Sequence, residues 1–280
     1  MRGGLMEFEV LADGMGFLES PRWRDGHLWV SDLLDDTVLK IGPDGQSVTV
    51  AAVPGKPGGM GFLPDGTPLI ASMYDRILYR IENGSLTAHA DLSCLAPRMI
   101  NDMVVDARGR AYLGDFGFNP HFGEEMTEGA MLLVEPDGRA RAVAAPMIFP
   151  NGMVIDRGRL IVSETRQCRM ISFAILGNGD LADRRIHVET EGGVDGCCLD
   201  VEGGLWMGIP RLQKFVRAKD GHVVETVPTP GRRAVACQVG GEDGRTLFLL
   251  THAGAPGTIG PERLGRVETM RVEVPGAGSP

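Results

Sequence analysis

The sequence predicts an all-β fold, a six-bladed β-propeller with four-stranded blades, and three observations lead to this prediction. Forty glycines and eighteen prolines are spread along the 280 residues, between short runs rich in Val, Ile, Leu, Trp and Tyr. The same order of turns and strands recurs six times at a spacing of about 40 to 50 residues, the period of a propeller blade. Sustained helical periodicity is missing, which disfavours a βαβ fold.

Each of the six repeats has a recognisable pair of strands. The inner strands are expected to begin within 19–23, 58–62, 101–105, 151–155, 195–199 and 235–239. The apolar strands that follow them are expected at 28–30, 69–71, 111–113, 160–162, 205–207 and 247–250. The repeats use nearly the whole chain, so residues 1–280 are expected to form a single propeller domain. Ring closure then requires Phe8–Leu11 to pair beside Val267–Val272, so that both ends of the chain share one blade.

Composition excludes several kinds of partner. The formal net charge of -9 leaves no basic stripe that could neutralise a phosphate backbone, so nucleic acid is not expected as a partner. No apolar stretch approaches the roughly 18 residues that a membrane span needs, and the first residues lack the apolar region of a signal peptide. We expect a cytoplasmic protein, monomeric or weakly homo-oligomeric, that acts on a small molecule.

In a propeller, the first residue of each inner strand lies at one mouth of the central channel. We call these the mouth positions, and the six repeats place there Glu19, Gly58, Asn101, Asn151, Asp195 and Val235. Four of these side chains carry oxygen donors. Carboxylates and amides that converge in an empty channel would repel one another or stay unsatisfied, whereas a hard cation accepts all four oxygens at once.

Calcium is the expected ion at the mouth positions, with zinc, manganese or magnesium as alternatives. Zinc is less favoured because no histidine or cysteine stands at these positions. The competing explanation is that Asn-Asp, Asn-Gly and Asp-Gly pairs simply form turns. Turn formation does not explain Glu19, which precedes Ser-Pro. The sequence therefore favours a metal site made by Glu19, Asn101, Asn151 and Asp195.

Other residues near this mouth are candidates for binding a substrate: Asn101, Arg98, Asn119 and Asp102. Asp102 either supports the metal ligands or bonds its own turn, and the sequence leaves both open. Two histidines, His121 and His252, could edge the pocket, but surface positions are favoured for both. Four methionines fall near channel-lining positions and could give the pocket an apolar wall: Met60, Met73, Met103 and Met153.

From about Phe8 to Pro275, the chain resembles the senescence marker protein/regucalcin/gluconolactonase family of six-bladed propellers. The motifs that carry the resemblance are Glu19-Ser20-Pro21-Arg22-Trp23, Asn101-Asp102, Phe149-Pro150-Asn151-Gly152-Met153 and Val194-Asp195-Gly196. The resemblance implies hydrolysis of a lactone ring and a divalent metal held by Glu19, Asn151 and Asp195. It also implies that Asn101 binds substrate or metal-linked water and that Asp195 is the general base.

The chain departs from the family pattern at three places. Glu-Ser-Pro replaces the usual Glu-Gly-Pro, and Val-Asp-Gly replaces Pro-Asp-Gly. Met99 stands where the family has an arginine, two residues before the Asn-Asp pair. The loss of that arginine beside several methionines would suit a less polar ring than a polyhydroxylated sugar lactone.

The expected activity is metal-dependent opening of a lactone ring, either of a sugar lactone or of a less polar one. The metal is expected to polarise the carbonyl, and water activated by Asp195 to attack it. One alternative is a phosphotriesterase or aryl esterase that uses the same metal site. The other is a calcium-binding propeller without catalysis, which a bound metal without hydrolysis of any lactone would indicate.

Overall fold

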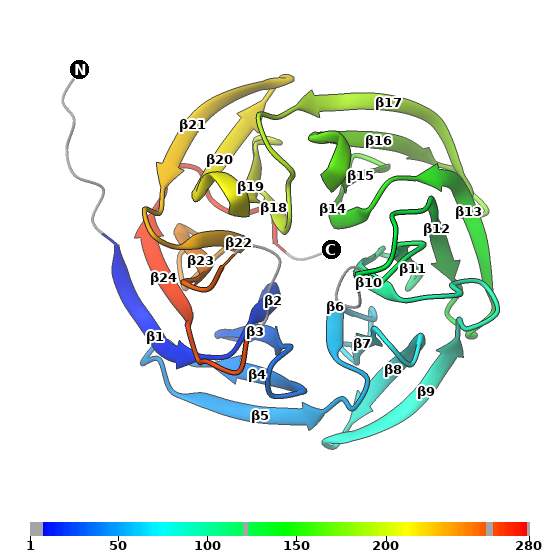
Figure 1. Cartoon of the computed structure of the whole chain (residues 1–280), viewed down its shortest axis with the longest axis horizontal. Coiled ribbons are helices and arrows are strands. Elements are labelled where there is room, and N and C mark those ends of the chain that lie inside the picture. The colour runs from blue at the N-terminus through cyan, green and yellow to red at the C-terminus, as the bar shows by residue number, and fades with distance from the viewer. Residues whose placement is uncertain (1–7, 120–122, 256–259, 279–280) are drawn as a thin grey trace.

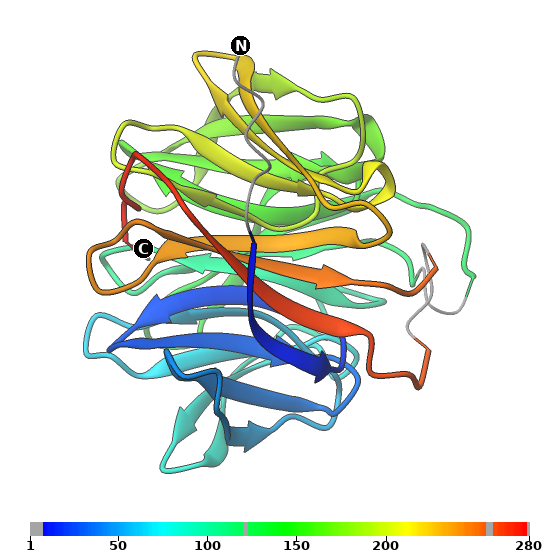
Figure 2. The same cartoon turned by 90° about the vertical axis from the view of Figure 1, so that its left-hand side faces the viewer.

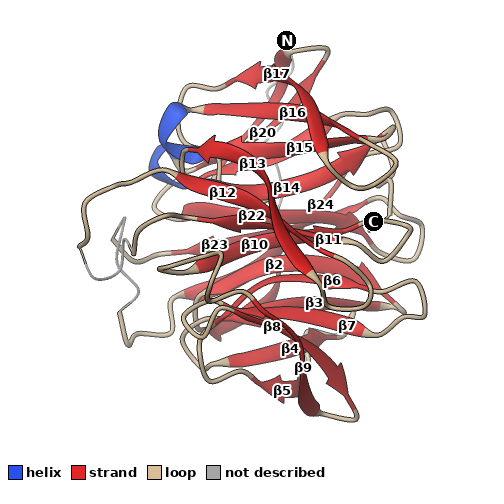
Figure 3. Ribbon diagram, turned by 90° about the vertical axis from the view of Figure 1, so that its right-hand side faces the viewer, coloured by secondary structure: helices blue, strands red, loops and turns tan. Residues whose placement is uncertain are grey.

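The computed structural model describes residues 8–119, 123–255 and 260–278, and this part of the chain forms six four-stranded antiparallel sheets. Figure 1 shows the sheets arranged as blades around a central channel. The predicted six-bladed propeller is confirmed. In the described residues, helix is limited to two short 3-10 turns, η2 (Thr165–Gln167) and η3 (Pro210–Leu212), as Figure 3 shows.

Blades 1 to 3 each run outward in chain order, from the inner strand to the outer one. Their strands are β2 (Leu18–Arg24), β3 (His27–Asp32), β4 (Thr37–Ile41) and β5 (Ser47–Ala52); β6 (Pro57–Phe62), β7 (Pro68–Ser72), β8 (Ile77–Glu82) and β9 (Ser85–Asp91); β10 (Ile100–Val105), β11 (Ala111–Asp115), β12 (Gly129–Val134) and β13 (Ala140–Met147). The predicted inner and second strands of these blades are therefore confirmed.

Blades 4 and 5 repeat this order, and blade 6 differs only in its outer strand. The strands are β14 (Pro150–Asp156), β15 (Arg159–Glu164), β16 (Arg169–Ile175) and β17 (Leu181–Glu189); β18 (Cys197–Leu199), β19 (Leu205–Ile209), β20 (Lys214–Lys219) and β21 (His222–Pro228); β22 (Arg233–Gly240), β23 (Thr246–His252), β24 (Gly265–Arg271) and β1 (Glu9–Met15).

The two ends of the chain close the ring, as predicted. Strand β1 pairs antiparallel with β24, with Glu9 opposite Thr269 and Val10 opposite Glu268. Figure 2 shows the two strands running together along one side of the molecule. Because β1 supplies the fourth strand of blade 6, the ring is held by main-chain hydrogen bonds between residues far apart in sequence.

Burial falls from the channel outward. All eight residues of inner strand β22 are buried, whereas β21, an outer strand, has one buried residue of seven. Inner strands are covered on both faces by neighbouring blades, and this explains their near-continuous apolar sequence. The segment that leads into β18 joins the inner strands on either side of it: the Gly152 amide donates to the Asp195 carbonyl at 3.0 Å, and the Gly196 amide donates to the Val235 carbonyl at 2.9 Å.

The inner strands carry an irregularity at the channel mouth. In five blades of the described chain, the ladder between the first and second strands shifts by one residue there, for example between Pro150 and Met153 and between Ile100 and Met103. Such a bulge bends the strand and re-aims the side chain of the extra residue. The shift thus re-aims side chains at the mouth of five blades, whereas Asp195 precedes β18, whose ladder with β19 is regular. No helix within the described ranges is long and apolar enough to cross a membrane.

Candidate active site

Three of the four oxygen-bearing mouth positions form a continuous hydrogen-bonded chain. Asn101 Nδ2 donates to Asn151 Oδ1 at 2.9 Å, and Asn151 Nδ2 donates to Asp195 Oδ1 at 2.7 Å. Glu19 lies near enough to Asp195 for the charge of that carboxylate to raise the pKa of Glu19. Side chains from blades 1, 3, 4 and 5 therefore meet at one end of the channel, as expected.

The two mouth positions without an oxygen donor give the pocket an apolar side. At Gly58, a Cβ atom would lie 2.7 Å from Met73 Cγ and 3.0 Å from the Asn101 carbonyl oxygen, so there is room for glycine alone. Met73 fills that space and is buried, as is Val235 at the remaining position. The mouth positions are therefore polar in blade 1 and in blades 3 to 5, and apolar in blades 2 and 6.

Burial dominates the electrostatics of the two carboxylates. It raises the pKa of Glu19 well above the usual value, and the charges of Asp195 and Asp102 raise it further. Burial also raises the pKa of Asp195 to about 7, against the hydrogen bond from Asn151, and Asp102 adds to the rise. Arg233 lowers the pKa of both groups. Two carboxylates held this close favour protonation unless a cation joins them.

The donor set fits a hard divalent cation. Glu19 and Asp195 offer carboxylate oxygens, and Asn101 and Asn151 carry amide oxygens, which are hard ligands of the same kind. Within the part of the chain that the structure describes, no group of three or more His, Cys, Asp and Glu side chains is arranged to hold a metal. A metal at the mouth would therefore need the two amide oxygens.

Asp102 lies deeper and is tied to neighbouring strands. Its Oδ1 accepts from Ser20 Oγ at 3.0 Å and from the Met103 amide at 2.7 Å, and it lies 3.8 Å from Arg22 Nη2. Asp102 thus bonds its own turn and also supports blade 1. Blade 2 lies between blade 1, which carries Ser20, and blade 3, which carries Asp102. The two side chains can meet past blade 2 because Gly59 of β6 has no side chain: a Cβ there would lie 2.3 Å from the Met103 nitrogen.

The other two substrate-binding candidates are joined through Glu124, which sequence reasoning did not single out. Arg98 is 56% exposed and its Nη1 lies 3.5 Å from Glu124 Oε1. Asn119 is buried, and its backbone N–H donates to Glu124 Oε2 at 2.8 Å. Substrate binding by Arg98, Asn119, Asn101 and Asp102 stays a prediction. His121 lies outside the described residues.

His252 is not at the surface, so the surface position favoured for it is wrong. Only 3% of it is exposed, because it ends β23 beneath Phe17, whose ring lies 5.0 Å away. Its Nδ1 contacts Arg233 Nη2 at 2.8 Å. Sequence reasoning missed Arg233, because its signal is only positional: it stands two residues before Val235, one of the two mouth positions that lack an oxygen donor.

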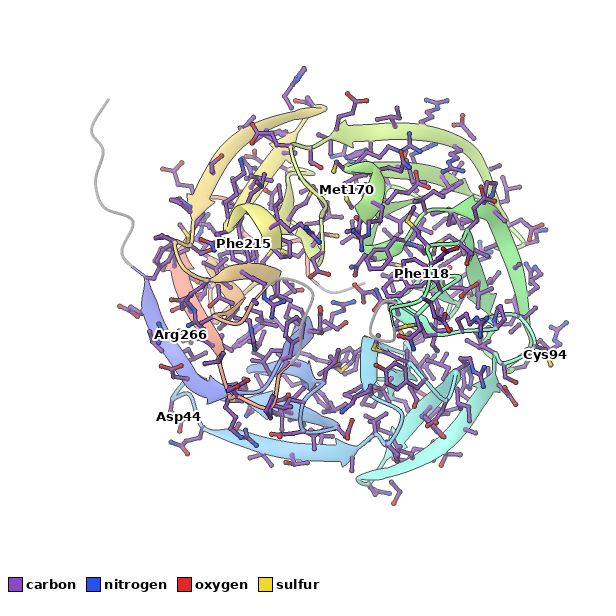
Figure 4. The ribbon with its side chains drawn as sticks, viewed as in Figure 1. Asp44, Cys94, Phe118, Met170, Phe215 and Arg266 are labelled. Atoms are coloured by element: carbon purple, nitrogen blue, oxygen red, sulfur yellow. The ribbon has the colours of Figure 1, made fainter. Side chains whose placement is uncertain are left out.

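Aromatic rings form a wall beside the polar side of the pocket. Phe149, two residues before Asn151, stacks on Phe116 with ring centroids 4.0 Å apart, and Phe118 lies 5.5 Å from Phe149. Figure 4 shows Phe118 on the channel side of its blade. The φ angle of Phe149 is +54°, a left-handed conformation that costs a bulky residue energy.

The apolar wall expected from four methionines is only partly as predicted. Met73 packs in the same cluster as Met99, Phe116 and Phe118. The other three point elsewhere, because their strands place them between blades or toward the far end of the channel. Met60 and Met103 belong to cores between blades, and Met153 lines a cavity of about 240 Å³ at the far end.

Comparison with known proteins finds similarity over most of the chain. The family model described as SMP-30/Gluconolactonase/LRE-like region matches residues 17–253. The chain is 26% identical to the 6-deoxy-6-sulfogluconolactonase of Pseudomonas putida, over 94% of this chain and 93% of that protein.

Two solved structures show the same fold. A gluconolactonase from Xanthomonas campestris has a TM-score of 0.76 and 23% identity, covering 98% of this chain and 91% of that one. A regucalcin from Agrobacterium tumefaciens, described as a calcium-binding protein, has a TM-score of 0.82 and 22% identity, covering 98% and 97%.

Proposed function

The chain belongs to the SMP-30/gluconolactonase/LRE-like family, and on that basis we propose that it is a metal-dependent hydrolase that opens a lactone ring. At the level of the family, relatives named as gluconolactonases and lactonases support lactone hydrolysis. The observation that carries the proposal is the hydrogen-bonded chain from Asn101 through Asn151 to Asp195, with Glu19 beside it.

Glu19, Asn101, Asn151 and Asp195 would hold the ion. We propose calcium, with manganese, magnesium and zinc as alternatives, because carboxylate and amide oxygens are hard ligands. When bound, such an ion supplies Lewis acidity toward the carbonyl oxygen of the ester.

Asp195 is proposed as the general base. In the metal-free chain, burial raises the pKa of Asp195 to about 7. A bound dication would lower that pKa, so Asp195 would be ionised and able to accept a proton at neutral pH. Asn151 donates to Asp195 Oδ1 and so fixes the orientation of the carboxylate. We propose that Asp195 Oδ2 accepts the proton of the attacking water.

Asn101 and the aromatic wall are proposed to handle the substrate. The Asn101 amide can donate to the oxyanion that develops on the carbonyl, an interaction that strengthens in the transition state. Phe149, which is half-buried and stacked on the buried ring of Phe116, offers an apolar surface to the substrate ring. This wall favours a less polar lactone over a polyhydroxylated one. The cytoplasmic location, the single domain and the monomeric or weakly oligomeric state stay predictions.

A substrate panel tests the proposal. Sugar, aliphatic and aromatic lactones, an aryl ester and a phosphotriester are assayed with a pH indicator, with and without chelator. We expect lactone opening that chelation abolishes and added calcium or manganese restores. Hydrolysis that survives complete metal removal would overturn the metal dependence. Metal binding without hydrolysis of any lactone would instead identify a binding protein.

A further inference from the structure

Asp195 is held differently from the other three oxygen-bearing mouth positions. Glu19, Asn101 and Asn151 lie within β2, β10 and β14. Asp195 instead precedes β18, which begins at Cys197, has three residues and forms a regular ladder with β19. The direction of the Asp195 side chain therefore depends on its backbone dihedral angles, which are set by the peptide groups on either side of it.

Both peptide groups that flank Asp195 are bonded at both of their polar atoms. In the group that follows it, the carbonyl accepts from the Gly152 amide at 3.0 Å, and the Gly196 N–H donates to the Val235 carbonyl at 2.9 Å. In the group that precedes it, the Asp195 N–H donates to the Gly208 carbonyl at 2.9 Å. These three bonds join main chain to main chain and reach blades 4, 5 and 6. The remaining atom is the carbonyl oxygen of the preceding group.

That carbonyl belongs to Val194, and it accepts hydrogen bonds from two hydroxyl groups of blade 4. Ser163 Oγ donates to it at 2.8 Å and Thr165 Oγ1 donates to it at 2.7 Å. The two hydroxyl oxygens lie 3.3 Å apart, so each is closer to the carbonyl than to the other. Val194 and Ser163 are buried, so loss of both hydroxyls would leave the carbonyl without a partner in the core. The two side chains therefore fix the peptide group that precedes Asp195.

The residues around Thr165 allow this contact. Gly193 has no side chain, and a Cβ there would lie 2.5 Å from the Thr165 carbonyl oxygen and 2.8 Å from Thr165 Cγ2. Thr165 is anchored in turn to its own blade, because its amide donates to the Phe149 carbonyl at 3.2 Å, two residues before Asn151. Thr165 thus links the two segments whose side chains, Asn151 and Asp195, are joined by a hydrogen bond of 2.7 Å.

A serine at the same place in blade 1 makes the same kind of contact. Ser31 is the last residue but one of β3, as Ser163 is of β15. Its Oγ donates to the Gly58 carbonyl in blade 2 at 2.7 Å. The residue of blade 1 that matches Thr165 is Leu33, which has no hydroxyl. One hydroxyl thus holds a mouth position without an oxygen donor, and two hold the segment that leads into blade 5.

We propose that Ser163 and Thr165 are positioning residues, which hold the Asp195 carboxylate where it can bind the ion and accept the proton of water. This inference rests on the proposed function, because it takes Asp195 as a metal ligand and base. Without the two hydroxyls, the peptide group before Asp195 keeps its bond to Gly208 and loses its hold on blade 4. A displacement of about 1 Å at a reacting group can cost on the order of 10²-fold in rate.

Four variants separate positioning from stability. Ser163→Ala/Thr165→Val removes both hydroxyls, Thr165→Val removes one without a change of shape, and Thr165→Ser keeps it. Tyr112→Phe is the matched control, because it removes a buried hydroxyl that donates to the Gly179 carbonyl at 3.0 Å. Tyr112 pairs with Val104, away from the mouth positions.

Hydrogen exchange of the metal-free proteins measures the positioning without turnover. We expect the Asp195 and Gly196 amides to exchange roughly tenfold faster in the double variant than in the wild type. In Tyr112→Phe they should exchange at the rate of the wild type. Unchanged exchange in a folded double variant would overturn the proposal by itself, whatever the protein is found to hydrolyse.

Calcium titration and steady-state kinetics measure the effect on the site. We expect the double variant to bind calcium roughly tenfold more weakly, and kcat at saturating calcium to fall roughly 10- to 100-fold with KM changed by less than about twofold. Thr165→Ser should stay close to the wild type, whereas Thr165→Val should not. Equal losses in Thr165→Ser and Thr165→Val, or losses as large in Tyr112→Phe, would overturn the proposal.

Two further outcomes are distinct from these. If neither the double variant nor Thr165→Val folds, the hydroxyls serve the fold, which also overturns the proposal. A wild type that binds no divalent ion and opens no lactone would contradict the proposed function instead.

Discussion

Asn151 Nδ2 lies 2.7 Å from Asp195 Oδ1, and this hydrogen bond joins inner strand β14 to the segment that leads into β18, between two residues 44 positions apart in the chain. The same amide accepts from Asn101 Nδ2 through its oxygen. One amide therefore sets the orientation of both neighbours. Asp195, the two amides and the nearby Glu19 are thus arranged so that all four side chains could bind one ion.

Replacing Asp195 with Asn should separate ion binding from turnover. We expect kcat for lactone opening to fall about 10²- to 10⁴-fold, because the variant lacks the base, while some metal binding persists through the remaining oxygens. Steady-state kinetics and calcium titration measure the two effects, and thermal unfolding checks the fold. Turnover close to the wild type would assign the base elsewhere.

The pH dependence of stability should change when the metal is removed. Burial raises the pKa of Asp195 to about 7 from its usual value of 3.8, so the metal-free folded chain holds this proton more tightly than the unfolded chain. The resulting stabilisation is fully present below about pH 4 and is lost as pH rises through about 7. Melting temperatures measured in chelator from pH 5 to 8 should show this loss.

The raised pKa values of Glu19 and Asp195 also predict how metal binding depends on pH. Protons compete with the ion at Glu19 and Asp195, so calcium affinity should rise from pH 6 to pH 8, with release of protons on binding. Calorimetry in buffers of different ionisation enthalpy measures the release. Asp195→Asn should release fewer protons, and an identical release would show that other groups titrate.

Gly59→Ala should disturb the site through the backbone. Its Cβ would lie 2.3 Å from the Met103 nitrogen and 2.5 Å from the Asp102 carbonyl carbon, and neither can move away as a flexible side chain would. We expect a loss of roughly 1–3 kcal/mol of unfolding free energy and weaker metal binding. Gly177→Ala is the matched control, because its Cβ would meet nothing within 4 Å. Equal stabilities of the two variants would contradict the close approach.

Phe149→Ala tests the aromatic wall. The stacked contact with Phe116 would be lost, so KM for apolar lactones should rise roughly tenfold, while KM for sugar lactones changes little. Tyr79→Ala on β8, away from the channel, provides the control. A parallel rise in KM for both classes would remove the argument for a less polar substrate.

Repetition explains which parts of the molecule were predictable. A residue's place in the repeat determines its place in the ring, so Glu19, Asn101, Asn151 and Asp195 could be aligned from their positions alone. Arg233 and His252 do not recur in the other blades, and their burial depends on Phe17, more than two hundred residues away. The positions of the methionine side chains could not be predicted either, because the repeat indicates that a residue lies in a strand but not which side of the blade its side chain faces.

Closure of blade 6 has a consequence for synthesis on the ribosome. Strand β1 emerges early, yet its partner β24 ends at Arg271, so the edge of β1 waits unpaired while five blades and two strands of the sixth are made. Pairing across so long a separation is slow, and an exposed edge invites association with other chains. The nascent protein is therefore most prone to aggregate just before its last strand is released.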